Sequence, residues 1–177
     1  MAVDHWDERY LSIAREVSTW SKDPSTKVGA VITDGDGRIV AVGFNGFPKK
    51  IADTMERRHN RNIKYKMTVH AEANVALIAG RAARNGTIYV HGAPICADCA
   101  GIVIQAGIKR VVAAAPCPLT PTSPCQPSHP TKIDWDEHGR VALEMFDEAD
   151  LKFEPVDIRA GRFVSGADLE NPAGGGT

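Results

Sequence analysis

The sequence predicts a single domain of the α/β class, because apolar segments with helical and with extended spacing alternate along most of its 177 residues. Hydrophobic residues make up 43% of the chain and charged residues 24%, proportions typical of a protein that buries a core. The domain is expected to span residues 1–159, and the Gly-rich end of the chain predicts a flexible C-terminal tail over residues 160–177. No apolar run approaches the ~20 residues of a membrane span, and the first residues lack an apolar signal segment, which favours a cytoplasmic protein.

The first part of the chain predicts a helix followed by a β-hairpin. A helix is expected over about residues 4–20, because apolar side chains recur there at helical spacing. These side chains are Trp6, Tyr10, Ile13, Ala14 and Val17. Two apolar segments, residues 28–33 and 38–43, flank a Gly-rich turn and predict two antiparallel strands.

The second part of the chain predicts helices and strands in alternation. The expected helices cover residues 70–81, 96–106 and 135–149. The expected strands cover residues 87–91, 109–115 and 152–156. This order implies a mixed sheet of five strands, an antiparallel hairpin followed by parallel strands, with helices covering it.

Two segments do not fit this alternation. Residues 45–67 are polar, basic and weakly periodic, and they are too many for a simple connection, so they form a candidate binding loop. Residues 116–130 hold six of the eleven prolines, which predicts an irregular Pro-rich loop.

Charge is unevenly distributed along the chain, although the formal net value is only −1. Residues 49–66 hold seven Lys and Arg against two acids, a local net charge of +5 that suits a phosphate; a solvated charged loop is the alternative. The candidate phosphate-binding residues are Lys22, Lys27, Arg57, Arg58, Arg61 and Lys64. Residues 134–157 hold nine acids against two bases, a local net charge of −7 that argues against a polynucleotide partner.

Two short motifs predict a zinc site at the starts of two helices. His70 lies two residues before Glu72, and Cys96 and Cys99 are separated by two residues. One imidazole and two thiolates suit tetrahedral zinc and leave a fourth position open, as in catalytic sites. Zinc lowers the pKa of bound water from about 16 to about 7, and Glu72 beside the metal is placed to move protons.

Other interpretations of these residues remain open. The cysteine pair alone also suits a redox pair or a structural zinc site, and His70 alone suits a buried core histidine. In a non-catalytic zinc protein, however, Glu72 would have no use beside an open ligand position. A second metal site is conceivable, but irregular spacing favours incidental placement of its residues. Those residues are Cys117, Cys125, His129 and His138.

Several segments carry a family resemblance that covers about residues 6–157. They are S-K-D-P-S at 21–25, G-F-N-G-F-P at 43–48, K-Y at 64–65, H-A-E-A-N at 70–74 and Q-A-G-I at 105–108. With these segments the chain resembles the cytidine and deoxycytidylate deaminase superfamily, and most of all its deoxycytidylate (dCMP) deaminases. The resemblance implies a cytidine-deaminase-like three-layer α/β/α sandwich around the five-stranded mixed sheet.

The resemblance also assigns roles to the zinc motifs. It implies that His70, Cys96 and Cys99 bind one catalytic Zn²⁺ ion per chain and that Glu72 is the proton shuttle. The family usually has proline directly before its first cysteine, whereas Ile95 precedes Cys96 here. This departure leaves open the shape of the pocket wall beside the metal.

Substrate contacts and partners follow from the same resemblance. It implies that Asn45 contacts the deoxyribose hydroxyl, that the backbone of Ala71 lies near the pyrimidine carbonyl, and that Tyr65 belongs to the substrate site. Members of the family are homo-oligomers, from dimer to hexamer, and some are regulated by dCTP and dTTP. A homo-oligomer is therefore expected, with a dCTP or dTTP effector as an open possibility.

These observations together predict a zinc-dependent hydrolase acting on cyclic amidines, which converts dCMP to dUMP and ammonia. The alternatives are another amino-base or nucleotide: CMP, cytidine, guanine, a modified or 5-substituted dCMP, or adenosine in tRNA. The acidic segment 134–157 argues against tRNA, because an enzyme that grips an RNA backbone profits from a basic surface.

Overall fold

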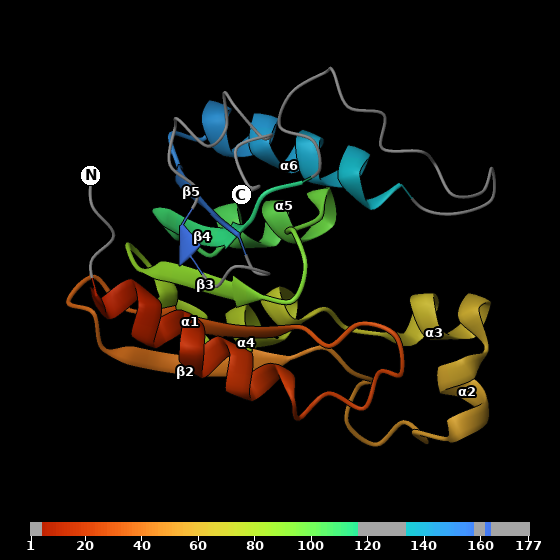
Figure 1. The fold of residues 1–177 in the computed structure, drawn as a ribbon. Coiled ribbons are helices and arrows are strands. Elements are labelled where there is room, and N and C mark those ends of the chain that lie inside the picture. Colours follow the sequence, from red (N-terminus) through yellow and green to blue (C-terminus); the bar gives the residue numbers. More distant parts are fainter. Residues whose placement is uncertain (1–4, 117–133, 158–161, 164–177) are drawn as a thin grey trace, which may run out of the picture.

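The computed structural model describes residues 5–116, 134–157 and 162–163, which form a sheet with helices on both faces (Figure 1). The strand order is β2-β1-β3-β4-β5-β6, and the sheet is mixed. The strands are β1 (Gly29–Thr33), β2 (Ile39–Phe44), β3 (Thr87–His91), β4 (Arg110–Ala114), β5 (Lys152–Asp157) and β6 (Arg162–Phe163). β1 pairs antiparallel with β2 and β3, while β3, β4 and β5 are parallel to one another.

Most of the helices lie on the two faces of the sheet, and two short ones lie to its side (Figure 1). They are α1 (His5–Ser18), α2 (Met55–His59), α3 (Arg61–Met67), α4 (Ala71–Ala79), the 3₁₀ turn η1 (Gly80–Ala83), α5 (Ala97–Gln105) and α6 (Trp135–Glu148). α1 covers one face through a small cluster that includes Ala14, Val31 and Val112. α4, α5 and α6 cover the other face, where the larger core holds side chains such as Val75 and Phe146. The predicted three-layer α/β/α sandwich is thereby confirmed.

The five expected strands all form in the expected order, and two details differ from the sequence prediction. β6, a two-residue strand antiparallel to β5, lies in the stretch expected to be a flexible tail. Residues 45–67 contain α2 and α3 rather than an irregular loop. Their N-caps explain this, because the Thr54 and Asn60 side chains accept hydrogen bonds from Arg57 N and Ile63 N. Apart from Pro116, the predicted Pro-rich loop lies outside the described residues.

Two glycines let the helices approach the hairpin closely from opposite faces. A Cβ on Gly29 would lie 2.5 Å from the backbone nitrogen of Ser18 in α1. A Cβ on Gly43 would lie 2.9 Å from the backbone nitrogen of Val75 in α4. Both distances are shorter than real Cβ contacts, so α1 and α4 can hold these positions only because the side chains are absent.

An ionic cluster joins α1 to the strands on its face of the sheet. The guanidinium of Arg110 donates hydrogen bonds to both carboxylate oxygens of Asp7, at 2.7 and 2.6 Å, and also pairs with Glu154. The Tyr89 hydroxyl donates to Asp7 at 2.8 Å. Burial alone would raise the pKa of Asp7, but these hydrogen bonds lower it below its usual value. The buried carboxylate is therefore charged and fixes the start of α1.

Among the described helices, none is both long and apolar enough to cross a membrane.

Candidate metal and substrate site

Three metal-ligating side chains converge where α4 and α5 begin. His70 is the N-cap residue of α4 and Cys96 is that of α5, and both have extended backbone. Neither side chain forms an N-cap hydrogen bond with its own helix, so both are available to point at a shared centre. The Nδ1 atom of His70 lies 3.4 Å from the Sγ atoms of Cys96 and Cys99, and all three donor atoms lie within 4.8 Å of one another.

The donor set fits zinc. With Zn–N near 2.0–2.1 Å and Zn–S near 2.3 Å, tetrahedral angles place N and S about 3.6 Å apart. The 3.4 Å separations between Nδ1 of His70 and the two sulfur atoms are close to that value. Three protein ligands leave one tetrahedral position for a further ligand, as in a catalytic site.

Charge at the cysteine pair also favours a cation. Hydrogen bonds from the Cys99 thiol and from His70 together lower the pKa of Cys96 to about 4, against the raising effect of burial. The hydrogen bond between the two cysteines, together with burial, raises the pKa of Cys99, which keeps the proton. The lowered pKa favours a thiolate at Cys96, which suits a cation, and a bound metal would deprotonate the second thiol as well.

Glu72 lies in the first turn of α4, two residues after His70, and is 3% exposed. Burial raises the pKa of its carboxyl to about 7, although its own backbone N–H and His70 act in the opposite direction. Ala71, between the two, has no exposed surface. A carboxyl with a pKa near neutrality can both accept and return a proton, as general acid–base catalysis requires.

Asn45 follows β2 and is held by the backbone around it. Its Oδ1 accepts a hydrogen bond from Val28 N at 2.8 Å, and its Nδ2 donates to Thr26 O at 2.9 Å. Ser21 Oγ donates to the carbonyl oxygen of Asn45 at 2.8 Å. The bonds to Val28 and Thr26 use one lone pair and one N–H of the Asn45 side-chain amide, which leaves a second lone pair and a second N–H for a ligand.

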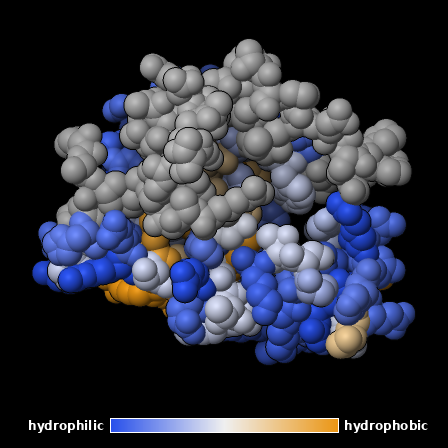
Figure 2. All heavy atoms as spheres, viewed as in Figure 1, coloured by the Kyte–Doolittle hydropathy of each residue, from blue (hydrophilic) through white to orange (hydrophobic). Residues whose placement is uncertain are grey.

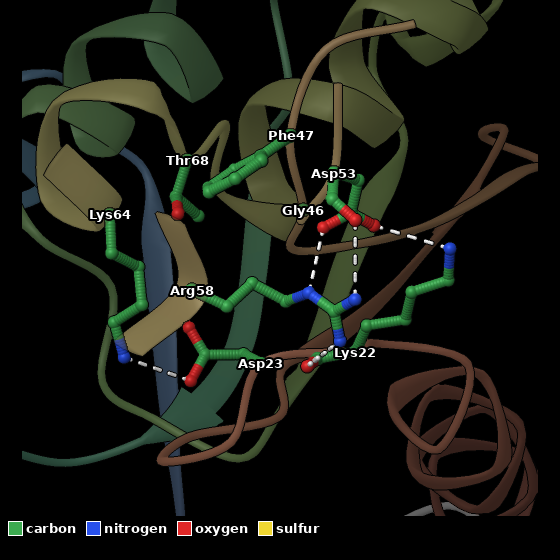
Figure 3. Close-up of a pocket in the computed structure, with 8 residues that line it drawn as sticks. All are labelled: Lys22, Asp23, Gly46, Phe47, Asp53, Arg58, Lys64 and Thr68. Atoms are coloured by element: carbon green, nitrogen blue, oxygen red, sulfur yellow. Dashed lines mark hydrogen bonds and ion pairs between the residues drawn. The ribbon is translucent and has the colours of Figure 1, made fainter. Parts of the chain in front are cut away.

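A pocket that is open to solvent lies between the loop that follows α1 and the short helices α2 and α3 (Figure 3). Its lining residues are Lys22, Asp23, Gly46, Phe47, Asp53, Arg58, Lys64 and Thr68. Gly46 pairs with Val69 through two backbone hydrogen bonds, at 3.1 and 2.8 Å, and Val69 directly precedes His70. The pocket is therefore joined through the backbone to the start of α4.

Three of the six candidate phosphate-binding residues line this pocket, and carboxylates pair with each of them. Arg58 Nε lies 2.8 Å and Lys22 Nζ 3.2 Å from the carboxylate oxygens of Asp53. Lys64 Nζ lies 3.0 Å from Asp23 Oδ1, and the side chains of this pair are only 7% and 10% exposed. Three cations and two carboxylates share the pocket, so its net charge is far smaller than the sequence suggested.

The other three candidates do not line the pocket. Lys27 is exposed, with its Nζ 3.5 Å from Thr19 O. Arg57 donates to Ala52 O at 3.0 Å, and Arg61 lies over the Tyr65 ring at 4.9 Å. In the view of Figure 2, hydrophilic residues dominate the surface over α2 and α3. For Lys27, Arg57 and Arg61, phosphate binding stays a prediction.

Sequence reasoning gave no role to Trp135, whose ring lies beside the metal triad. Its centroid is 5.9 Å from that of His70 and 6.1 Å from that of Tyr65. The pattern placed Trp135 only at the start of a helix, and no local signal indicates contact with a residue 65 positions earlier.

Two further residues from the sequence analysis can be placed. Ile95, which stands before Cys96 where the family usually has proline, is 3% exposed and belongs to the larger core. Of the residues considered for a second metal site, only His138 lies among the described residues.

The fold and the triad together define a class of protein. A three-layer α/β/α domain that brings one histidine, two cysteines and a buried glutamate to the starts of two helices is typical of zinc-dependent hydrolytic deaminases.

Comparison with known proteins narrows this class to a family. The cytidine and deoxycytidylate deaminase zinc-binding region matches residues 4–115. An uncharacterized deaminase from the luxG 3' region of Aliivibrio fischeri is 39% identical over 158 residues, which are 88% of this chain and 98% of the relative. The chain belongs to the cytidine and deoxycytidylate deaminase family.

Named relatives and solved structures agree with this assignment. The deoxycytidylate deaminase of Mus musculus is 38% identical over 113 residues, which are 60% of this chain and 63% of the mouse protein. The match thus spans less than two thirds of that relative. The dCMP deaminase of the cyanophage S-TIM5, solved in complex with dCMP and dUMP, superposes with a TM-score of 0.62 over 88% of this chain and 99% of the phage chain. At 19% identity, this likeness concerns the fold.

Proposed function

We propose that this enzyme deaminates dCMP to dUMP with release of ammonia. The observation that carries the proposal is the junction of two sites: a cation-lined pocket connects through Gly46 and Val69 to the residue that starts the metal triad. A nucleoside monophosphate carries an amino-base and a phosphate in one molecule, which suits two adjoining sites of this kind. The names of the mouse and cyanophage relatives support the same substrate.

The chemistry is assigned to the triad and Glu72. When bound by His70, Cys96 and Cys99, zinc supplies a Lewis acid that makes water a nucleophile near neutral pH. Glu72 accepts the proton from the attacking water and passes it to N3 of the base as the C4–O bond forms. The hydroxyl now on C4 gives up a second proton, which moves through Glu72 to the amino group; the C4–N bond then breaks, ammonia leaves, and a carbonyl remains at C4. Burial of Glu72 keeps these protons away from bulk water.

Phosphate recognition is assigned to Lys22 and Arg58. Lys22 is 67% exposed and shares Asp53 with Arg58, so both cations can turn part of their donor capacity toward a phosphate. Lys64 is buried in its ion pair with Asp23 and acts as a structural residue of the pocket.

The test compares a substrate with and without its phosphate. Ammonia release and product identity are measured for the zinc-loaded enzyme with dCMP, deoxycytidine, CMP, guanine and a tRNA that bears the target adenosine. We expect a strong preference for dCMP over deoxycytidine. Arg58→Gln should raise the KM for dCMP while leaving that for deoxycytidine unchanged, and Lys66→Gln, at an exposed position of α3, serves as control. Equal turnover of dCMP and deoxycytidine would overturn the phosphate assignment.

The proposal includes a homo-oligomer that uses α4. Leu77 and Ile78 on this helix are 77% and 64% exposed, and Ile102 on the neighbouring α5 is 40% exposed. Large apolar side chains grouped on a surface are typical of association faces. Leu77→Lys should lower the molar mass measured by light scattering; an unchanged mass would exclude this face.

A cytoplasmic location is part of the proposal too. Cys96 and Cys99 are free thiols at the metal site, and a reducing compartment keeps such ligands available.

A further inference from the structure

An aromatic pair lies beside the metal triad and takes no part in the chemistry above. Trp135 begins α6, and Tyr65 belongs to α3. The Tyr65 and Trp135 rings meet edge to face at 6.1 Å and 72°, and Trp135 is tilted 57° against the His70 ring at 5.9 Å. Figure 1 shows the start of α6 on the same side of the molecule as α2 and α3. The two rings therefore extend from the basic helix α3 to a metal ligand.

Packing of α6 fixes Trp135 relative to the cysteines. A Cβ on Gly139 would lie 2.7 Å from Pro116 Cβ and 3.6 Å from Pro94 Cβ, so the first half of α6 lies directly against the segment that leads into Cys96. The His138 ring lies 5.8 Å from that of Trp135, and its buried Nδ1 has no hydrogen-bond partner among the described residues. The position of the indole thus depends on the same segment as the metal site.

Trp135 retains free surface in this position. Its side chain is 38% exposed although it contacts two other rings. A flat indole surface next to a metal ligand suits a flat ring, because nucleobases stack on aromatic side chains with useful affinity. The electron-rich faces of the two rings offer no charge to a phosphate, which separates this surface from Lys22 and Arg58.

We propose that Trp135, with Tyr65 packed against it, is a base-binding residue that contacts the ring of the amino-base during deamination. The identity of that base rests on the function proposed above. The structure thereby divides recognition between two surfaces: Trp135 contacts the base, and Lys22 with Arg58 contacts the phosphate.

Kinetics of three variants test this division. Trp135→Ala should raise the KM for dCMP and for deoxycytidine by the same factor, about 10-fold or more, because the lost stacking energy does not depend on the phosphate. Trp135→Phe keeps an aromatic face and should recover most of the affinity. Trp6→Ala is the matched control, since Trp6 is also a half-exposed ring near a helix start, on the opposite face of the sheet. Zinc content should stay near one per chain in all three.

Two outcomes would overturn the proposal. An unchanged KM in Trp135→Ala would show that the base does not use this surface. Loss of zinc with a lower kcat and an unchanged KM would make Trp135 a support for His70 instead.

A binding measurement keeps this test independent of the substrate assignment. The chain has three tryptophans, so Trp6→Phe with Trp20→Phe leaves Trp135 as the sole indole. Its fluorescence should be quenched by dUMP and by cytosine but left unchanged by deoxyribose 5-phosphate, which has no base. A signal insensitive to every base would contradict the proposal. If the wild-type enzyme turns over another base of the panel, the substrate assignment falls alone, and the titration and kinetics are repeated with that base.

Discussion

The metal triad and the cation-lined pocket are neighbours, but they differ in how their side chains are already engaged. His70, Cys96 and Cys99 contact one another through donor atoms that a metal would use. Lys22, Arg58 and Lys64, in contrast, face carboxylates that balance most of their charge (Figure 3). Motif spacing at two helix starts therefore predicts a reactive centre directly, whereas a run of basic residues predicts little until its ion pairs are known.

The largest effect should come from Glu72, which separates a catalytic triad from a structural one. Glu72→Gln removes the proton shuttle and should lower kcat by roughly 10²- to 10⁴-fold, the usual contribution of a general acid–base residue. Ammonia release and zinc content are measured together, with Glu144→Gln, an exposed glutamate of α6, as control. Retained turnover, or loss of zinc, would contradict the assigned role.

The next effect concerns the buried ion pair of the pocket. Lys64→Met leaves the Asp23 carboxylate without its cation and should lower the free energy of unfolding by about 3 kcal/mol. Lys66→Met, two residues away on the exposed side of α3, should change it little. Urea unfolding of the zinc-loaded protein measures both. Equal stability of the two variants would mean that the ion pair does not hold Lys64 and that its ammonium is available to ligands. The difference between the pocket and the metal triad would then be smaller.

The pH dependence of stability should report the same pair. Burial alone would raise the pKa of Asp23, but hydrogen bonds from Ser25 N, Thr26 N and Lys64 lower it below 3.8. A lowered pKa means that the folded state favours the carboxylate, so this stability is present above pH ~4 and is lost as the pH falls through the folded value. In Asp23→Asn, the free energy of unfolding should therefore fall less steeply as the pH is lowered below about 4. If the variant lost stability with falling pH as steeply as the wild type, groups other than Asp23 would cause the acid sensitivity.

The smallest effect is expected at Lys27. Its exposed ammonium lies outside the pocket lining, so Lys27→Ala should change the KM for dCMP by less than about twofold, within the small range of exposed ion pairs. A large rise in KM would add Lys27 to the proposed phosphate site beside Lys22 and Arg58.

The sequence predicts the metal centre well, because its determinants are local. The ligands lie at or next to the starts of α4 and α5, and those starts follow from helix propensity and motif spacing. The short helices α2 and α3 escape prediction, since five and seven residues carry little periodicity and depend on the caps Thr54 and Asn60.

Long-range pairings explain the remaining differences. Lys64 pairs with Asp23, 41 positions away, and the charge pattern of the basic run does not by itself distinguish Lys64 from Lys66. Trp135 reaches His70 through the packing of α6 on Pro94 and Pro116. In both cases the partner is chosen by tertiary structure, which the spacing of a single segment does not encode.

Gly43 lies on β2, a strand that carries no metal ligand, yet it affects the metal site through the position of α4. Because α4 lies against this glycine, a side chain there would push the helix away from the sheet by a few tenths of an ångström or more. His70 moves with α4, whereas the cysteines move with α5, which packs on α6. A side chain at position 43 would therefore change the distance between His70 Nδ1 and the two sulfur atoms, and that distance decides which metal bond lengths fit the site.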